Sequence, residues 1–216
     1  MRKELKILRT DGVCVFLIVL FHVVGLIGFL VPAFQPLFKQ LVPFHLLLML
    51  FLIVRSQKGK NVYFLAFLLI CYFAGFFAEL AGVQTGLIFG NYAYGATLGY
   101  KIAGTPLMIG VNWILVIYSV GMVVDRMGIN NAVAAAALGA VLVTILDVII
   151  EPVAVRFDYW SWHGNEIPLQ NYMGWLVLAF FLLLSFFKLP FKKGNPAGVV
   201  LFVVQFAFFV ILLTAN

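Results

Sequence analysis

Seven runs of apolar residues, each about the length of a helix that crosses a lipid bilayer, constrain this chain more than any other feature. The runs cover approximately residues 13–31, 37–55, 62–80, 105–124, 132–151, 172–187 and 197–214. The chain is 64% hydrophobic and 10% charged, whereas a soluble domain is about 45–50% apolar and about 25% charged. Lipid must therefore cover much of its surface. The sequence predicts an all-α fold, with residues 1–216 forming a single polytopic transmembrane domain.

The basic residues between the runs indicate the orientation of the helices, because Lys and Arg gather in cytoplasmic loops. Eleven of them lie before the first run or in alternate connections, and these are Arg2, Lys3, Lys6, Arg9, Arg55, Lys58, Lys60, Arg126, Lys188, Lys192 and Lys193. The other connections hold only Lys39, Lys101 and Arg156. We therefore expect a cytoplasmic N-terminus, a C-terminus outside and a multi-pass position in the plasma membrane. This distribution also accounts for the net charge of +6, so no nucleic-acid partner is expected.

Two long connections, over residues 81–105 and 152–171, fall on the predicted outer side, and long connections in compact proteins are often functional. The first run lacks a small-x-small cleavage site at its end, so we expect it to remain as an uncleaved helix. Cys14 and Cys71 both fall inside apolar runs. They are expected to be small core residues, neither a disulfide pair nor part of a structural zinc site.

Three acidic residues, Glu79, Asp147 and Glu151, lie within apolar runs or at their ends. Ionisable residues at membrane depth are costly and usually functional. Asp147 and Glu151 are four residues apart, which places both on one face of a helix. A carboxylic acid that keeps its proton near neutral pH is what general acid catalysis requires. The alternative is a structural role, in which these acids pair with Arg156, Lys101 or tyrosine hydroxyls.

Glycines recur every fourth residue at Gly82, Gly86 and Gly90. On a continuous helix they would form a smooth stripe for close packing. The alternative is a bent or re-entrant segment, tolerated at membrane depth only where protein or a cavity covers it. Such a segment would bring three polar side chains to a cavity, namely Asn91, Tyr92 and Tyr94.

The tryptophans Trp160, Trp162 and Trp175 fit either an interfacial aromatic belt or an aromatic wall facing an electron-poor intermediate. The three histidines, His22, His45 and His163, form no HxxxH or HExxH pair, which argues against di-iron oxygenases and zinc peptidases. A haem between His22 and His45 is an alternative, although two lone histidines in a membrane are more often packing residues. The last run contains no lysine for a retinal Schiff base.

An ordered set of short motifs over roughly residues 75–180 is more specific than any of its parts. The motifs are ExxG at 79–82, FGNYxY at 89–94, LG at 98–99, GxPL at 104–107, NW at 112–113, DxxxEPVA at 147–154, YWxW at 159–162 and IPLQNYxGW at 167–175. This set resembles the bacterial and archaeal carotenoid biosynthesis membrane family, which includes carotenoid 1,2-hydratases and hydratases of C50 bacterioruberin precursors. Glu151 stands where that family often has aspartate, so the carboxyl group is retained on a longer side chain.

The resemblance implies addition of water to a terminal C=C bond of an acyclic carotenoid, lycopene-like or a C50 precursor, with membrane lipid around it. Protonation gives a tertiary carbocation that water captures, so we expect neither a metal nor a cofactor. Asp147 or Glu151 would donate the proton, while Glu79 or the other acid stabilises charge or orients water. The substrate-binding residues are expected to be Asn91, Tyr92, Tyr94, Trp113, Trp160, Trp162, Asn171 and Trp175.

Two other functions fit the same sequence features. A lycopene cyclase-type enzyme begins with the same protonation, but an internal double bond captures the cation in place of water. A non-catalytic protein that binds carotenoid or lipid needs the aromatic pocket without the acids. The oligomeric state is left open by the sequence.

Overall fold

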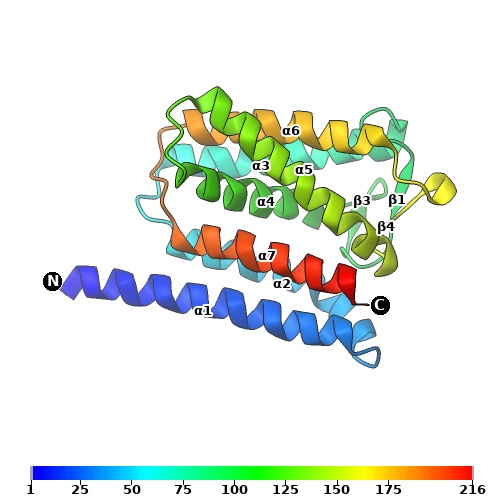
Figure 1. The fold of residues 1–216 in the computed structure, drawn as a ribbon, viewed down its shortest axis with the longest axis horizontal. Helices are drawn as coiled ribbons and strands as arrows, with labels where there is room; N and C mark the ends of the chain where they lie inside the picture. Colours follow the sequence, from blue (N-terminus) through cyan, green and yellow to red (C-terminus); the bar gives the residue numbers. More distant parts are fainter. Residues whose placement is uncertain (1, 216) are drawn as a thin grey trace.

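A computed structural model describes residues 2–215, with side chains from residue 11 onward, and contains seven long helices in that part of the chain. They are α1 (Arg2–Leu30), α2 (Gln35–Ser56), α3 (Val62–Thr85), α4 (Met108–Asp125), α5 (Ala132–Arg156), α6 (Leu169–Lys188) and α7 (Pro196–Thr214). The helices run up and down, so that the described ends of the chain lie at opposite ends of the bundle (Figure 1). The predicted helical fold with seven helices is confirmed. The side chains of Arg2, Lys3, Lys6 and Arg9 lie outside the described residues.

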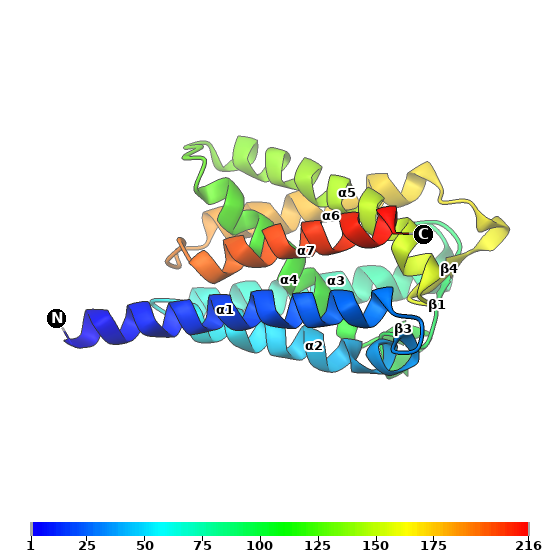
Figure 2. The same ribbon diagram turned by 60° about the horizontal axis from the view of Figure 1, so that its bottom comes forward.

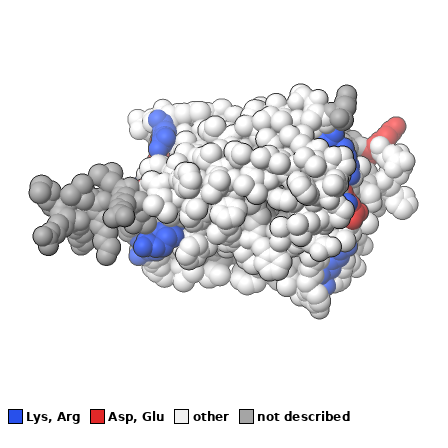
Figure 3. All heavy atoms as spheres, turned by 90° about the horizontal axis from the view of Figure 1, so that it is seen from below, with Lys and Arg blue, Asp and Glu red and all other residues white. Residues whose placement is uncertain are grey.

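The surface of the bundle has the character of a membrane protein. All seven helices are long and apolar enough to span a bilayer, the first of them over Asp11–Leu30. Lys, Arg, Asp and Glu side chains gather at the two ends of the molecule, and the body between them is uncharged in the view of Figure 3. The structure therefore supports a multi-pass membrane protein, and its orientation and the identity of the membrane stay predictions.

Helix α4 forms the centre of the bundle. It contacts α2, α3, α5, α6 and α7, and 78% of its span is buried, a larger share than in any other helix. Its buried side chains include Trp113 near its beginning and Tyr118 in its middle. These five helices surround α4, α1 packs on α2 and α7, and the helices around α4 expose apolar side chains, as lipid-facing helices do.

Three helices have an asparagine as their N-cap residue, at the end of the bundle that carries the short connections. Asn61 caps α3, Asn131 caps α5 and Asn195 caps α7, each by accepting a backbone N–H from the first turn. The Asn195 amide also donates to Tyr118 Oη at 2.7 Å, and that hydroxyl donates to Gln57 Oε1 at 2.5 Å. This network connects α2, α4 and α7.

At the opposite end, two helices run more than a turn beyond their predicted ends. Helix α3 continues to Thr85 and is closed by Gly86 in the left-handed conformation at φ +68°. Of the two alternatives for the glycine segment, the continuous helix through Gly90 is wrong, because the chain bends at Gly86. Helix α5 continues through Pro152 to Arg156, so Glu151 lies inside the helix and not at its end.

Short strands, which were not predicted, join the two long connections over residues 86–107 and 157–168. Strand β1 (Tyr92–Tyr94) pairs antiparallel with β4 (Trp160–Trp162), with Tyr92 opposite Trp162 and Tyr94 opposite Trp160. Strand β2 (Lys101–Ile102) pairs with β3 (Thr105–Pro106), and a 3₁₀ turn, His163–Asn165, follows β4. Figure 2 places β1, β3 and β4 at the same end of the bundle.

Candidate functional site

The pair of acids on α5 is fully buried and shares one hydrogen-bond donor. Asp147 is 0% exposed and Glu151 is 1% exposed. Asn171, on the neighbouring helix α6, donates from its amide nitrogen to Asp147 Oδ2 at 2.8 Å and to Glu151 Oε1 at 3.0 Å. The four-residue spacing therefore places both carboxyl groups on one helix face, as predicted, and α6 bridges them.

Two indole N–H groups hold the second oxygen of Glu151. Trp160 Nε1 donates to Glu151 Oε2 at 2.9 Å and Trp162 Nε1 donates to the same oxygen at 2.8 Å. Both rings are almost wholly buried, so they do not form an interfacial belt. Their alternation in β4 points both inward, with exposed Ser161 between them.

Glu79, on α3, is 3% exposed and accepts hydrogen bonds from three aromatic side chains. Tyr92 Oη donates to Glu79 Oε2 at 2.5 Å and Tyr94 Oη donates to it at 2.7 Å. Trp113 Nε1, on α4, donates to Oε1 at 3.0 Å. The Trp113 ring stacks on Trp175 of α6, with centroids 4.3 Å apart and planes 25° from parallel.

The pairing of β1 with β4 is what brings these aromatic side chains to the acids. Residues 92 and 94 and their partners in β4 all point to one face, because alternate residues of a strand share a face. Gly95 N donates to Tyr159 O at 2.9 Å and Thr97 Oγ1 donates to Phe157 O at 2.8 Å, which extends the connection beyond the strands. Burial, and next the charge of Glu79, raise the pKa of Tyr92 and of Tyr94, so both hydroxyls remain donors.

Cations do not neutralise the three acids. Lys101 Nζ donates to the Tyr94 carbonyl at 2.5 Å, and Arg156 donates to the carbonyls of Leu212 and Ala215. Across the residues whose side chains are described, the one ion pair joins Lys58 and Asp11, at 2.9 Å. Arg156, Lys101 and the tyrosine hydroxyls were considered as structural partners of the acids. Of these, only the tyrosine hydroxyls bind an acid, namely Glu79.

A small cavity of about 10 Å³ lies among these groups. Its walls are Glu79, Phe89, Tyr92, Tyr94, Ile109, Glu151, Trp160, Trp162, Asn171 and Trp175. A cavity of roughly 10–15 Å³ is the smallest that holds one water molecule, and such a water needs polar partners. Asp147 lies behind this cavity, and its Oδ1 is buried without a hydrogen-bond partner among the described residues.

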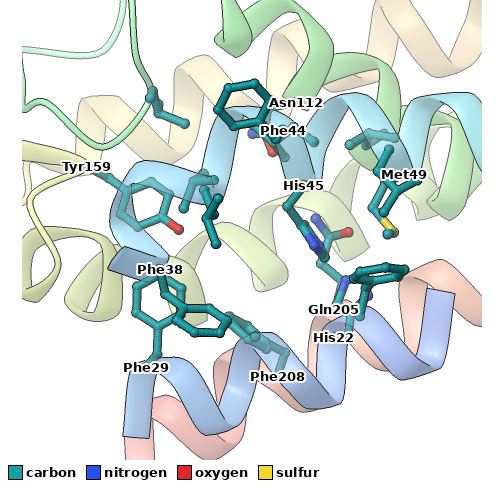
Figure 4. A pocket seen from close by; sticks show the side chains of 18 of the residues that line it. His22, Phe29, Phe38, Phe44, His45, Met49, Asn112, Tyr159, Gln205 and Phe208 are labelled. Carbon is teal, nitrogen blue, oxygen red and sulfur yellow. The ribbon is translucent and has the colours of Figure 1, made fainter. Parts of the chain in front are cut away.

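A second, larger pocket of about 300 Å³ adjoins the first. It lies among α1, α2, α4, α5 and α7, and shares Ile109 and Trp160 with the small cavity. Its walls are mostly apolar and aromatic, including Phe29, Phe38 and Phe208 (Figure 4). Sequence reasoning missed this pocket, because its residues are scattered over five helices and the connections between them, and the motifs at 98–99, 112–113 and 159–162 each give it only one or two side chains.

The predicted site residues therefore lie together, with one exception. Glu79, Asp147 and Glu151 are joined by hydrogen bonds or shared walls to Tyr92, Tyr94, Trp113, Trp160, Trp162, Asn171 and Trp175. Asn91 is exposed and lines neither cavity, because it precedes β1 with its side chain against Gly86. What each residue does in catalysis stays a prediction.

The remaining candidates, all within the described residues, make no hydrogen bond to the three acids. His22 and His45 contact each other edge to face, with ring centroids 4.8 Å apart, and His163 is exposed. Cys14 and Cys71 are buried free thiols, which confirms that they form no disulfide. Among the residues that the structure describes, no group of three or more His, Cys, Asp or Glu side chains is arranged to hold a metal ion.

The fold and the site define a class: a multi-pass helical membrane protein with three buried carboxyl groups surrounded by aromatic donors, beside an apolar pocket. The chain belongs to the carotenoid biosynthesis protein family, whose model matches residues 39–216. It is also 31% identical, over 115 residues, to the bisanhydrobacterioruberin hydratase of Haloarcula japonica. That match covers 50% of this chain and 39% of the relative, so the chain spans well under two thirds of it. No solved structure matches the chain.

Proposed function

We propose that this chain adds water to a terminal C=C bond of an acyclic carotenoid by acid catalysis. One observation carries the proposal: Glu79 and Glu151 line a cavity the size of one water molecule, and this cavity shares Trp160 and Ile109 with an apolar pocket. Hydration of an alkene needs an acid, a single controlled water and an apolar place for the polyene. Membership of a carotenoid biosynthesis family and the likeness to a hydratase support the same reaction.

The proton comes from the pair on α5. Two carboxyl groups that share Asn171, without a cation, cannot both be ionised at low cost, so the pair keeps one proton. Glu151 faces the cavity and delivers that proton to the less substituted alkene carbon. Asp147 lies behind it and acts as the reserve for the proton.

The resulting tertiary carbocation forms beside aromatic rings and a carboxylate. The indole rings of Trp160, Trp162 and Trp175 line the cavity, and ring faces attract cations. Glu79 shares no hydrogen-bond donor with the pair on α5, and in this proposal it is the ionised carboxylate. It orients the water, takes the proton that the water loses on adding to the cation, and so leaves a tertiary alcohol. Return of this proton to the pair on α5 restores the site.

The substrate enters from the lipid. The rim of the large pocket includes Phe21 and Val24 on α1 and Leu41 and Phe44 on α2, all exposed on the apolar surface, with Phe44 68% exposed. In a bilayer these side chains face acyl chains, so a polyene passes between α1 and α2 without crossing water. A stretched carotenoid is about as long as the bilayer is thick, about 30 Å.

The site lies at the outer face of the plasma membrane in this proposal. Eleven of the fourteen Lys and Arg residues lie in the N-terminal segment or in and beside the connections that begin α3, α5 and α7, whereas the end with the acids carries Lys39, Lys101 and Arg156. The positive-inside rule then assigns the N-terminal end to the cytoplasm.

The test is expression in cells that accumulate lycopene, or a C50 precursor, followed by mass spectrometry of the pigments. Products heavier by one or two waters are expected from the unaltered chain, and Glu151→Gln, Asp147→Asn and Glu79→Gln should each lower their yield. Loss of a general acid costs about 100- to 10,000-fold in rate. Glu166→Gln is the matched control, because Glu166 is an exposed acid at the same end of the bundle.

Other outcomes identify the alternatives. A product of unchanged mass but altered absorption would identify a cyclase-type reaction. Full water addition by Asp147→Asn, Glu151→Gln and Glu79→Gln would overturn the assignment of the acids. Unreacted pigment that co-purifies equally with the unaltered chain and the three variants would identify a binding protein.

A further inference from the structure

Polar side chains gather inside the large apolar pocket, away from the three acids. His22 on α1, His45 on α2 and Gln205 on α7 lie together at one end of it, and Tyr159 lies toward the other end (Figure 4). His22 and Gln205 are each only 7% exposed. Neither the acid chemistry nor the packing of the helices requires these polar groups in an otherwise apolar pocket.

The hydrogen-bonding capacity of this group is only partly used. His22 Nδ1 lies 2.8 Å from the carbonyl oxygen of Ile18, so in the neutral ring this nitrogen carries the proton and donates. Its Nε2 is then an acceptor. Gln205 Oε1 is buried without a hydrogen-bond partner among the residues that the structure describes. Buried polar atoms of this kind are rare, since most find a partner in the protein or in a ligand or water.

A hydroxyl group of a ligand meets these requirements best. It donates to one acceptor, either His22 Nε2 or Gln205 Oε1, and accepts from the Gln205 amide or the His45 ring. A carbonyl group only accepts, and it would leave both acceptors unmatched. A pure hydrocarbon satisfies none of these atoms.

We propose that His22, His45 and Gln205 form a subsite for the hydroxyl group of an otherwise apolar isoprenoid ligand, held in the pocket beside the acids. The inference rests on the proposed function in one respect, because it implies a substrate that carries an alcohol group remote from the double bond that reacts beside the acids. Trp160 lines both cavities and donates to Glu151, so a ligand that extends from the subsite to Trp160 brings its other end to the acids.

The test compares two ligands that differ by one oxygen: farnesol, and the hydrocarbon analogue in which hydrogen replaces its hydroxyl group. Their affinities for the purified chain in lipid nanodiscs are measured by calorimetry, for the unaltered protein and for Gln205→Leu and His22→Phe. The control is Val203→Leu, which changes an exposed position of α7. Taking the alcohol-to-hydrocarbon ratio for each protein cancels the different partitioning of the two ligands into lipid.

The unaltered chain and Val203→Leu are expected to share an alcohol-to-hydrocarbon ratio, which falls about 2- to 10-fold in Gln205→Leu and in His22→Phe. Binding of the hydrocarbon should stay unchanged, which shows that the pocket is intact. Equal ratios in all four proteins overturn the subsite. If one variant also fails to bind the hydrocarbon, its pocket is disturbed, and the alcohol-to-hydrocarbon ratio of the other variant tests the subsite.

The outcome is separable from that of the proposed reaction. Glu151→Gln should keep the full preference for the alcohol while it loses water addition. If the chain adds no water to any carotenoid but binds the alcohol in preference to the hydrocarbon, and Gln205→Leu weakens this preference, the subsite is supported and the proposed reaction is overturned.

Discussion

Gly75 determines where the indole of Trp113 lies. A Cβ atom at this position would come within 2.5 Å of Trp113 Cγ and 2.6 Å of its Cδ1. That indole donates to Glu79 and stacks on Trp175. Gly75→Ala should therefore displace Trp113 and lower water addition about 10- to 100-fold, as small displacements near a reacting centre do. Yield is measured per amount of membrane-inserted protein.

Gly12→Ala is the control for this change, because a Cβ there meets no atom within 4 Å. It should leave the yield unchanged. Equal yields from Gly75→Ala and Gly12→Ala would mean that the position of Trp113 is irrelevant to the reaction.

Asn171 supplies the one donor that Asp147 and Glu151 share. Asn171→Leu leaves oxygens of two buried carboxyl groups without their amide partner, at a cost of about 1–3 kcal/mol in the free energy of unfolding. The variant should also lose activity. The nearby Met173→Leu, at an exposed position of the same helix, should change stability by no more than about 0.5 kcal/mol. Unfolding in detergent checks both values, and equal stability of the two variants contradicts the bridging role.

Among the secondary-structure elements, the three-residue pairing of β1 with β4 orients four aromatic donors. Ala93 lies opposite Ser161 and both are exposed, so a change there alters the strand without touching the acids. The neighbouring hydrogen-bonded pairs at 91–163 and 95–159 place 93–161 in the hydrogen-bonded class as well. Ala93→Pro removes the N–H of this pair and should lower water addition, whereas Ala93→Thr, which suits a strand, should retain it. Pigment analysis of the two variants compares them, and equal activity would show that the strand pairing is dispensable.

The helices were predictable because each apolar run carries its own evidence. The ends of α3 at Thr85 and of α5 at Arg156 were not predictable. A proline such as Pro152 usually ends a helix, but α5 stays helical through it because the surrounding helices pack against it. Strands β1 and β4 are too short to show an alternating pattern, and their pairing joins residues far apart in the sequence.

For the whole molecule, the presence of a buried acidic site was predictable from the sequence, but the hydrogen-bond partners of each acid were not. Acids inside apolar runs stand out in any sequence, so Glu79 and Glu151 were identified without coordinates. Their partners were named only as pocket residues, because the packing of α3, α4 and α6 with the two long connections decides which indole binds which acid. The large pocket could not be predicted, since each helix contributes only a few side chains to it, most of them apolar, and only the packing of the helices brings them together.

The orientation of the bundle yields a prediction that depends on no assumption about chemistry. Met127 lies in the connection between α4 and α5, at the end opposite the acids, while Glu166 lies in the connection before α6; both are exposed. With Cys14 and Cys71 changed to alanine, single cysteines are placed by Glu166→Cys or by Met127→Cys. Neither change removes a basic residue that sets orientation.

A membrane-impermeant maleimide should label Glu166→Cys in intact cells, whereas Met127→Cys should be labelled only after permeabilisation. The reason is that Lys and Arg favour cytoplasmic connections, and the acids lie at the other end of the bundle. The reverse pattern would place the acids at the cytoplasmic face, and the charge distribution would then have failed to set the topology. Because the seven helices fix the relative positions of the two ends, labelling at these two residues determines the side of the membrane on which the carboxyl groups lie.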